Sequence, residues 1–473
     1  MVDGRALTAQ FEGAADFETR KVLCGGQLLT VLFLDGLTSG GDIAEQVVRP
    51  LAQMTDEARE EVLYTRALQG GVWCASVKEP ESTQQAAELL VNGFCVILFP
   101  KSGKALGCEV KTGEKRSPSP PETENTVKGA KDAFTETLRT NTSLVRRHLR
   151  TPGLRLTETV IGKRTLTKVT VCWIDRLTDP ELPRRMQERL SSIDIDGALS
   201  PAAIEEYVPG SRRTAFPLLE YTERTDHFCQ GLLDGQVGLL ADGLPLGYLA
   251  PVGLGRLMRS PEDRATDFFS ASMLRLLRYA ALGVSLLLPA LYAAMAMFHQ
   301  QMLPTKLLLS IIESKQNVPF STLLEVLGLL CAFELLQQAG LHLPQAVGTA
   351  VSIIGGLVVG TAAVDAKLVS PAALIVTASS GICGFTLPNR ELSDAVRLWR
   401  FVLTVLAGLW GLFGVTVGLL LLLTELAGLE SLGRSYLSPF GRAEVKGALV
   451  RPRLVRQKWR DGALKPMDDQ NQR

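Results

Sequence analysis

The clearest group of residues that could do chemistry in this chain is a short run of charged side chains. Glu223, Arg224 and Asp226 place three charges within four residues, beside an apolar segment with the pattern of a β-strand. Carboxylate and guanidinium groups form strong, charge-assisted hydrogen bonds. The run is therefore either a lock between two domains or two subunits, or a solvated turn.

Sequence motifs for catalysis and nucleotide binding are missing. Residues 101–104 (KSGK) lack the first glycine and the final Ser or Thr of a phosphate-binding loop, and residues 253–255 lack the third glycine of a dinucleotide fingerprint. The eight cysteines form no CxxC pair and no metal-ligand spacing with the four histidines, so we interpret them as reduced, buried thiols. The sequence predicts no enzyme activity, no cofactor and no bound metal.

Small and hydroxyl-bearing residues concentrate in two apolar segments, 343–364 and 368–389, which only three residues separate. Small side chains let helices pack closely, and Ser and Thr hydroxyls can bond across the contact. Alternatively, the same surface lines a narrow ion path in an oligomer, closed by a valine constriction that excludes water. The pore or gate candidates are Gly355, Gly356, Val358, Val359, Thr361, Ser370, Thr377 and Ser380.

The charge of the chain is unevenly distributed, although 50 basic and 49 acidic residues among 473 leave a net charge of only +1. Four uncharged stretches are each long enough to cross a bilayer as a helix, and they are residues 279–298, 343–364, 368–389 and 401–424. Residues 320–340 are also apolar but contain Glu325 and Glu334, which are costly at bilayer depth. We expect a re-entrant or interfacial helix there, with a fifth span as the alternative. These spans exclude a soluble enzyme, a secreted disulfide scaffold and a disordered protein.

The first half of the chain alternates strand-like and helix-like segments. It predicts two α/β subdomains, residues 1–108 and 128–255, separated by a polar, proline-containing linker at 109–127. A basic juxtamembrane helix over 256–278 then leads into an all-α, polytopic membrane domain of about four transmembrane helices (279–426) and a basic tail (427–473). With no signal-peptide pattern, the positive-inside rule places both termini in the cytoplasm.

Long segments of the chain are similar to a known family. FTETLRTNTSLVRRHLR, YTERTDHFCQGLLDGQVGLLADGLP and AVGTAVSIIGGLVVGTAAVDAKLVSPAALIV, among others between about Thr126 and Leu426, resemble the A subunits of bacterial spore germinant receptors, the GerA family. The resemblance implies an inner spore membrane protein that works beside a transporter-like B subunit and a lipoprotein C subunit. It also implies a ring of A subunits acting as a nutrient-gated ion channel, with the nutrient bound mainly by the B subunit. Membrane lipid is a further expected partner, and nucleic acid is not.

The family motifs can be placed residue by residue, and we expect them to couple domains or subunits. A TERPD-type motif falls on Thr222, Glu223, Arg224 and Asp226, with Thr225 in place of the usual proline. An RGPREAF-type segment is KGAKDAF at 128–134. The SPEDY-type motif gives Ser260, Pro261, Glu262 and Asp263. An ESR-type motif followed by VPFP gives Glu313, Ser314, Lys315 and Pro319. The departures mark a divergent member.

Two alternatives to a receptor channel remain open at this point. One is a paralogue similar to SpoVAF, which is linked to the dipicolinic acid channel and would amplify dipicolinic acid and ion release. The other is a non-conducting scaffold that organises receptor clusters through its cytoplasmic half. An ion-flux measurement separates the scaffold from the other two.

Overall fold

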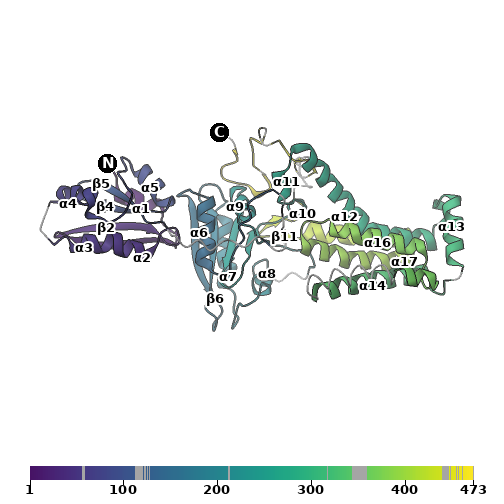
Figure 1. Ribbon diagram of the computed structural model, residues 1–473. Coiled ribbons are helices and arrows are strands. Elements are labelled where there is room, and N and C mark those ends of the chain that lie inside the picture. The colour runs from purple at the N-terminus through teal and green to yellow at the C-terminus, as the bar shows by residue number, and fades with distance from the viewer. Residues whose placement is uncertain are drawn as a thin grey trace.

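The computed structural model describes residues 1–55, 59–111, 128–210, 214–316, 318–342, 360–438 and most of 447–471, together with positions 121, 124 and 126. Two α/β subdomains and a helical bundle follow one another along an elongated molecule (Figure 1). The N-terminus lies in the first subdomain, and the last segment of the chain returns to the second (Figure 1). This order confirms the predicted fold class of two α/β units followed by a helical region.

The first subdomain is a five-stranded antiparallel sheet covered on both faces. The strand order is β1-β2-β4-β5-β3, with β1 Phe17–Cys24, β2 Gln27–Leu34, β3 Val77–Lys78, β4 Phe94–Phe99 and β5 Lys104–Glu109. One face packs against α1 (Gly4–Gln10) and α5 (Thr83–Val91). The other packs against α2 (Gly40–Asp42), η1 (Ile43–Val48), α3 (Arg49–Gln53), α4 (Glu60–Arg66) and η2 (Ala67–Gly71). Every residue of β4 is buried, because helices cover both its faces.

The second subdomain repeats this plan. Its antiparallel sheet has the order β6-β7-β9-β10-β8, with β6 Leu154–Ile161, β7 Thr167–Ile174, β8 Glu220–Thr222, β9 Val237–Ala241 and β10 Gly247–Ala250. Helices α6 (Leu138–His148) and α9 (Thr225–Leu233) cover one face, and α7 (Glu181–Ser191) and α8 (Ala202–Tyr207) cover the other. All eight cysteines of the chain are free.

The helical bundle is built around α12 (Phe268–Met297), which packs extensively against α16 (Pro371–Phe385) and α17 (Arg390–Gly428). Among the described residues, α12, α14 (Thr322–His342) and α17 are long and apolar enough to cross a membrane. The predicted first span lies within α12, whereas most of the second, 343–364, lies outside the described residues. The predicted third span contains α16, an apolar helix of only 15 residues. Residues 320–340 contribute one continuous helix, α14, whose length fits the alternative of a fifth span.

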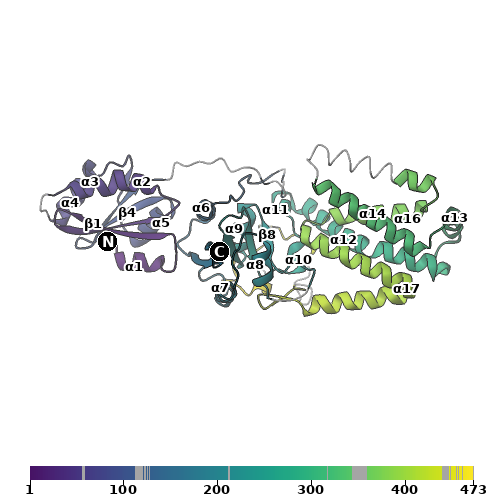
Figure 2. The ribbon, with the colours of Figure 1, turned by 90° about the horizontal axis from the view of Figure 1, so that it is seen from below.

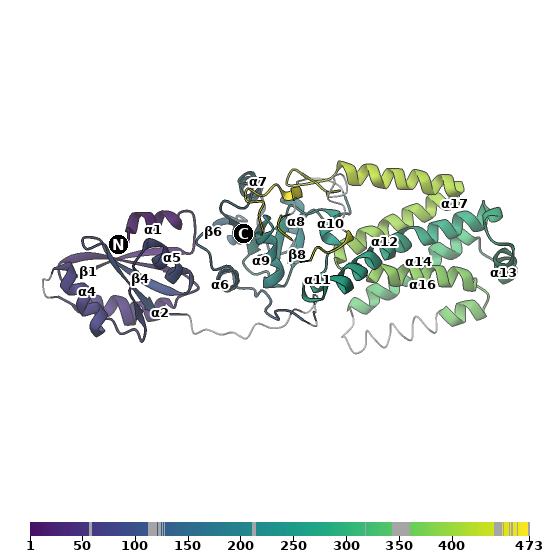
Figure 3. The same cartoon turned by 90° about the horizontal axis from the view of Figure 1, so that it is seen from above.

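The predicted fourth span, 401–424, is wrong as a single straight helix. Gly411 has φ 63° and ψ −141°, a conformation that essentially only glycine adopts, and the chain reverses there. A Cβ on Gly418 would lie 2.4 Å from Leu403 Cδ2, although these residues would be about 22 Å apart in one straight helix. The two arms, 390–410 and 412–428, therefore form a close helical hairpin (Figure 3). Hydropathy alone does not reveal the reversal, because both arms are apolar.

The predicted basic helix over 256–278 is also wrong as a single helix, because two short helices and the first turns of the long helix α12 replace it. Helix α10 (Leu254–Leu257) and helix α11 (Glu262–Ala265) precede α12. Pro261 begins α11, and the Asp267 carboxylate caps α12 by accepting from the backbone N–H of Phe269 and Ser270 at 3.0 and 3.1 Å.

The predicted tail, 427–473, is partly integrated into the fold. After α17, β11 (Glu430–Ser431) and β12 (Arg434–Ser435) form a small hairpin. Leu432 within it packs in the core of the second subdomain, and Tyr436 packs in the cluster at the base of the bundle. The end of the bundle is thereby fixed to the soluble half.

A buried ion pair joins the two subdomains. Arg146 on α6 donates from Nε and Nη2 to the two carboxylate oxygens of Asp16, each at 2.7 Å, and both side chains are 1% exposed. The backbone N–H of Ala15 donates to Leu156 O at 2.7 Å beside this pair. A bidentate pair of this kind fixes the orientation of two elements, and removal of either partner leaves a buried charge.

We predict that Asp16→Asn lowers the free energy of unfolding by about 3–5 kcal/mol, because Arg146 keeps its charge without a carboxylate. Denaturant unfolding of the purified chain in a mild detergent measures this. The control is the partly exposed Arg139, which pairs at 3.0 Å with Asp35 of the first subdomain and with Glu158 of the second. Arg139→Gln should cost less than about 1 kcal/mol. Equal losses of unfolding free energy in the two variants would show that the buried pair stabilises the protein no more than the control pair does.

A second prediction follows from the hairpin formed by the two arms of α17. It concerns Trp410, which is exposed beside the turn. In a chain with Cys331→Ser, a cysteine at Trp410→Cys should react with a membrane-impermeant maleimide from the side opposite to the soluble subdomains. Glu430→Cys, which follows the second arm, should react only from the subdomain side. A single straight helix would instead bury position 410 at mid-bilayer and leave it unlabelled from both sides.

Candidate functional site

Two of the predicted motifs meet in the second subdomain. Arg224 is 2% exposed and donates from Nε and Nη2 to the carboxylate of Asp226 at 3.0 and 2.7 Å. Its Nη1 donates to Thr126 Oγ1 at 2.7 Å. The backbone N–H of Phe134 donates to Glu223 O at 2.8 Å. The charged run is thus a lock within one chain, which holds the end of the linker on the subdomain, and not a solvated turn.

Gly129 makes this contact possible. A Cβ at this position would lie 2.8 Å from Arg224 Nη2, so any side chain would displace the guanidinium. Thr222 also belongs to the lock, because its hydroxyl accepts from the Arg224 backbone N–H at 3.1 Å and donates to the Glu124 carboxylate. The segment with the KGAKDAF sequence therefore packs against residues 223–226 of the TERTD sequence, and Glu124 before it contacts Thr222.

Two of the positions at which this chain departs from the family motifs, Thr225 and Asp132, are in contact. Thr225 Oγ1, where the family has proline, donates to Asp132 Oδ2 at 2.7 Å. His148 Nε2 on α6 lies 2.7 Å from the same oxygen and 3.2 Å from Thr225 Oγ1. The hydrogen bond from His148 holds the pKa of Asp132 at about 2, and the same bond raises the pKa of His148.

Asp263, from the SPED sequence, connects the second subdomain to α12. Its carboxylate is 2% exposed and accepts from Arg278 Nη1 at 2.8 and 2.9 Å and from Arg275 at 3.2 and 3.3 Å. The Ser260 backbone N–H donates to the same carboxylate at 3.3 Å, and the Glu262 N–H donates to Ser260 Oγ at 3.4 Å. The motif therefore forms a compact turn that presents Asp263 to the first helix of the bundle.

An ionic network extends from this turn into the subdomain. Arg256 on α10 donates to Glu220 at 2.8 Å and to Asp234 at 3.0 Å, and Arg264 donates to Asp234 at 2.9 Å. Burial alone raises the pKa values of Glu220 and Asp234, but the neighbouring cations outweigh it and hold both at about 2. Sequence reasoning missed this network, because it counted these arginines only as membrane-flanking charge.

The ESR-type motif lies at the end of the bundle away from the soluble subdomains, on α13 (Thr305–Lys315) (Figure 2). Lys315 Nζ lies 3.5 Å from Glu325 Oε2. The backbone N–H and the hydroxyl of Ser370 donate to the same carboxylate at 3.2 and 3.4 Å. Glu325 therefore joins a family-motif residue to a gate candidate. Glu313 and Pro319 are exposed, and Ser314 Oγ donates to the backbone O of Ile311 at 2.8 Å.

The described gate candidates on α16 are buried inside the bundle of a single chain. Thr377 Oγ1 donates to Ala373 O at 2.8 Å in its own helix, and Ser380 Oγ donates to Ser285 O of α12 at 2.7 Å. Ser380 also accepts from the buried Arg400 at 3.2 Å. These contacts correspond to the close-packing interpretation. Thr361 is exposed, and Gly355, Gly356, Val358 and Val359 lie outside the described residues.

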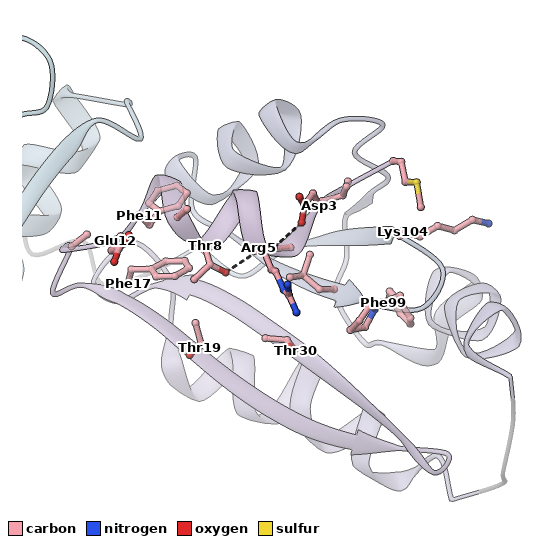
Figure 4. Close-up of a pocket in the computed structure, with 18 of the residues that line it drawn as sticks. Asp3, Arg5, Thr8, Phe11, Glu12, Phe17, Thr19, Thr30, Phe99 and Lys104 are labelled. Atoms are coloured by element: carbon pink, nitrogen blue, oxygen red, sulfur yellow. Dashed lines mark hydrogen bonds between the residues drawn. The ribbon is translucent and has the colours of Figure 1, made fainter.

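A separate groove of about 1250 Å³ lies in the first subdomain between α1 and the sheet (Figure 4). The rings of Phe11 and Phe17 stack there at 5.0 Å. The polar groups of α1 mostly serve the helix itself, since Asp3 caps it and Thr8 Oγ1 donates to Gly4 O at 2.8 Å. The described lining includes no histidine or cysteine, so the groove offers a binding surface without an evident reactive group.

Over the described residues, no cluster of His, Cys, Asp and Glu is suited to a metal ion.

Fold and site together define a membrane protein in which one buried ion pair joins two α/β subdomains and another cluster of ion pairs joins the second subdomain to a helical bundle. The chain belongs to the Bacillus/Clostridium GerA spore germination protein family, whose sequence model matches residues 5–466. This finding confirms the resemblance deduced from the sequence.

Individual relatives cover nearly the whole chain. It is 36% identical over 450 residues to the uncharacterized membrane protein YfkQ of Bacillus subtilis (94% of this chain, 87% of the relative). It is 34% identical to spore germination protein KA of the same organism (93% and 81%) and 32% identical to spore germination protein GerLA of Bacillus cereus (91% and 88%). The crystal structure of the N-terminal domain of the A subunit of the Bacillus megaterium germinant receptor GerK3 is similar with a TM-score of 0.41 and 23% identity, over 52% of this chain and 92% of that one.

The pair of His148 and Asp132 predicts a pH dependence of stability. Because the folded-state pKa of His148 is raised, its contribution is complete below about pH 6.5 and is lost as the pH rises through that raised value. Asp132 acts in the opposite range: its contribution is present above about pH 3.9 and is lost as the pH falls towards 2. The His148 contribution should be on the order of 1 kcal/mol or less, since a third of its side chain is exposed.

Urea unfolding between pH 5.5 and 8.5 tests the first window. His148→Gln should remove the decline in stability above pH 6.5. The matched control is Thr225→Val, which removes a neutral hydroxyl from the same cluster and should lower stability by about 1 kcal/mol at every pH. A decline of unchanged size in His148→Gln would contradict the assignment to this pair.

Proposed function

We propose that this protein is an A-type subunit of a nutrient germinant receptor of the inner spore membrane, and that its bundle forms part of an oligomeric ion channel. Family membership and relatives named spore germination proteins support the receptor role. The structural observation that carries the gating proposal is the pair of Asp263 with Arg275 and Arg278, because it joins the second subdomain to the first helix of the bundle.

The second subdomain holds the bundle at two places. Asp263 holds the start of α12, and the hairpin after α17 holds its end. In this hairpin Ser431 Oγ donates to Leu218 O at 2.6 Å and accepts from the Val252 N–H at 3.0 Å. Helices α12 and α17 also share the most extensive helix contact. A movement of the subdomain would therefore shift both helices together relative to α14 and α16.

Gating by such a movement requires two packings of the bundle with similar free energy. No bond is made or broken in this mechanism. We expect the signal to come from a transporter-like B subunit that binds the nutrient, with a lipoprotein C subunit and further copies of this chain in the complex. The exposed apolar side chains of α17, such as Leu409, Phe413 and Leu420, supply surface for lipid or for neighbouring helices.

A second candidate function, a non-conducting scaffold, is favoured by one observation. Ser370, Thr377 and Ser380 are at most 3% exposed and are bonded within the chain, so this side of α16 is closed to water. In the channel proposal, the path must instead pass between copies of the chain. Potassium efflux from liposomes that contain the purified complex separates the two, because a scaffold gives none.

We predict that Asp263→Asn slows nutrient-triggered potassium and dipicolinic acid release from spores at least tenfold. The substitution leaves Arg275 and Arg278 without their shared buried carboxylate, at a cost of about 3–5 kcal/mol, which exceeds a typical coupling free energy of about 1–3 kcal/mol. Asp196→Asn, which removes an exposed carboxylate of the same subdomain, is the matched control and should leave release unchanged. Membrane extracts must show equal amounts of all three proteins.

The outcomes distinguish the candidates. A normal nutrient response in Asp263→Asn spores, with the protein present, would refute coupling through this carboxylate. Slower dipicolinic acid release with an unchanged nutrient response in spores that lack the gene would support the amplifying paralogue in place of the receptor subunit.

A further inference from the structure

Helix α13 lies across the end of the bundle that faces away from the soluble subdomains, whereas its neighbours run along the bundle (Figures 1 and 2). The chain enters it from α12 and leaves it for α14, and both of these helices have the length and hydropathy of membrane spans. Because the ends of such spans lie at the membrane surface, the 11 residues of α13 lie at that surface as well. Its position is thus set by the helices on either side.

One face of α13 is fixed by packing. Ile311 is 7% exposed and belongs to a cluster with Tyr292 of α12, Val326 and Leu330 of α14 and Ala373 of α16. Lys315, one turn further on, reaches Glu325. These contacts determine which side chains of the helix point away from the bundle.

The remaining surface divides into an apolar and a polar side. Leu309 and Ile312, three residues apart and therefore neighbours on the helix, are 61% and 44% exposed. Lys306, Ser310 and Glu313 are exposed on the adjacent side. A short helix with one apolar and one charged side is the pattern of a segment that lies in the plane of a membrane interface.

The apolar side continues a larger apolar surface at the same end. Phe298 and Met302 precede α13, Phe320 follows it, and all three are at least 49% exposed. They adjoin the exposed apolar surfaces of α12 and α14. If these helices span the bilayer, those surfaces face the hydrocarbon of the lipid. This continuity favours lipid as the occupant over a water-soluble partner.

We propose that α13 is an in-plane anchor, with Leu309 and Ile312 immersed at the boundary between headgroups and acyl chains in the leaflet opposite the soluble subdomains. The anchor fixes the depth of Lys315, and through Lys315 it fixes the buried carboxylate of Glu325 and the Ser370 cap of α16. This inference concerns membrane contact alone, so it stands or falls independently of ion conduction.

The test uses the full chain in nanodiscs of phosphatidylcholine and phosphatidylglycerol, with Cys331→Ser to remove an exposed thiol. An NBD fluorophore is attached at Leu309→Cys, and Glu313→Cys on the charged side is the matched control. Lipids brominated near the glycerol end of the acyl chain should quench the probe at 309 at least threefold more than the probe at 313. Aqueous iodide should show the reverse order. Ile312→Cys is a second position for the case in which Leu309→Cys does not fold.

Two results would overturn the proposal. If iodide quenches the probes at 309 and 312 as strongly as the probe at 313, the apolar side lies in water. If neither iodide nor brominated lipid reaches the probes at 309 and 312, protein covers this side, and a second copy of the chain is the occupant. The second result is checked by repeating the measurement at one chain per nanodisc, where quenching by brominated lipid would restore the proposal.

Discussion

One buried carboxylate holds the first helix of the bundle to the second subdomain. Asp263 is shared by Arg275 and Arg278, and all three side chains are at most 12% exposed. Charges at such depth are stable only when opposite charge and hydrogen bonds compensate their loss of hydration. The charge cluster therefore fixes the direction of the start of α12, beside the apolar cluster that also crosses this boundary.

The same principle recurs at each boundary of the molecule. Asp16 and Arg146 join the two subdomains, Arg224 and Asp226 hold the linker, and Glu220 and Asp234 enclose Arg256. Apolar clusters fill the two subdomains, and a further apolar cluster crosses from the second subdomain into the bundle, so the ion pairs add direction to contacts that are also apolar. Because a guanidinium requires directed partners, these boundaries specify a small number of relative orientations. This property suits a protein proposed to transmit a movement.

The sequence predicted those features that depend on local periodicity. The alternation of strand-like and helix-like segments indicated the two α/β units, and the polar linker located the boundary between the sheets. Gly411 shows the limit of this approach, since a glycine within an apolar run does not reveal whether the chain bends or reverses. The three elements that replace the helix over 256–278 depend on Pro261 and on the Asp267 cap, whereas the prediction rested on the basic residues that precede the first span.

The candidate site was predictable in its residue types but not in its partners. Arg224 and Asp226 pair within four residues, so their interaction could be deduced from the sequence. Asp263 with Arg275, and Glu325 with Ser370, pair across distances in the chain that only the fold determines. Ser370, Thr377 and Ser380 were predicted as gate candidates, and their hydroxyls bond within the single chain. Those bonds depend on neighbours such as Ser285 and Arg400, which the sequence does not place.

The reversal at Gly411 has a mechanical consequence. It returns the chain to the subdomain side, so the beginning of α12 and the end of α17 are both attached to the second subdomain. A force applied by that subdomain acts on both helices in the same direction and along their axes. Under such a force the two helices would move together, parallel to their neighbours, as in a shear motion. They would not separate from the bundle one at a time. Shear strains many side-chain contacts simultaneously, so the bundle should resist small thermal displacements and yield collectively above a threshold force.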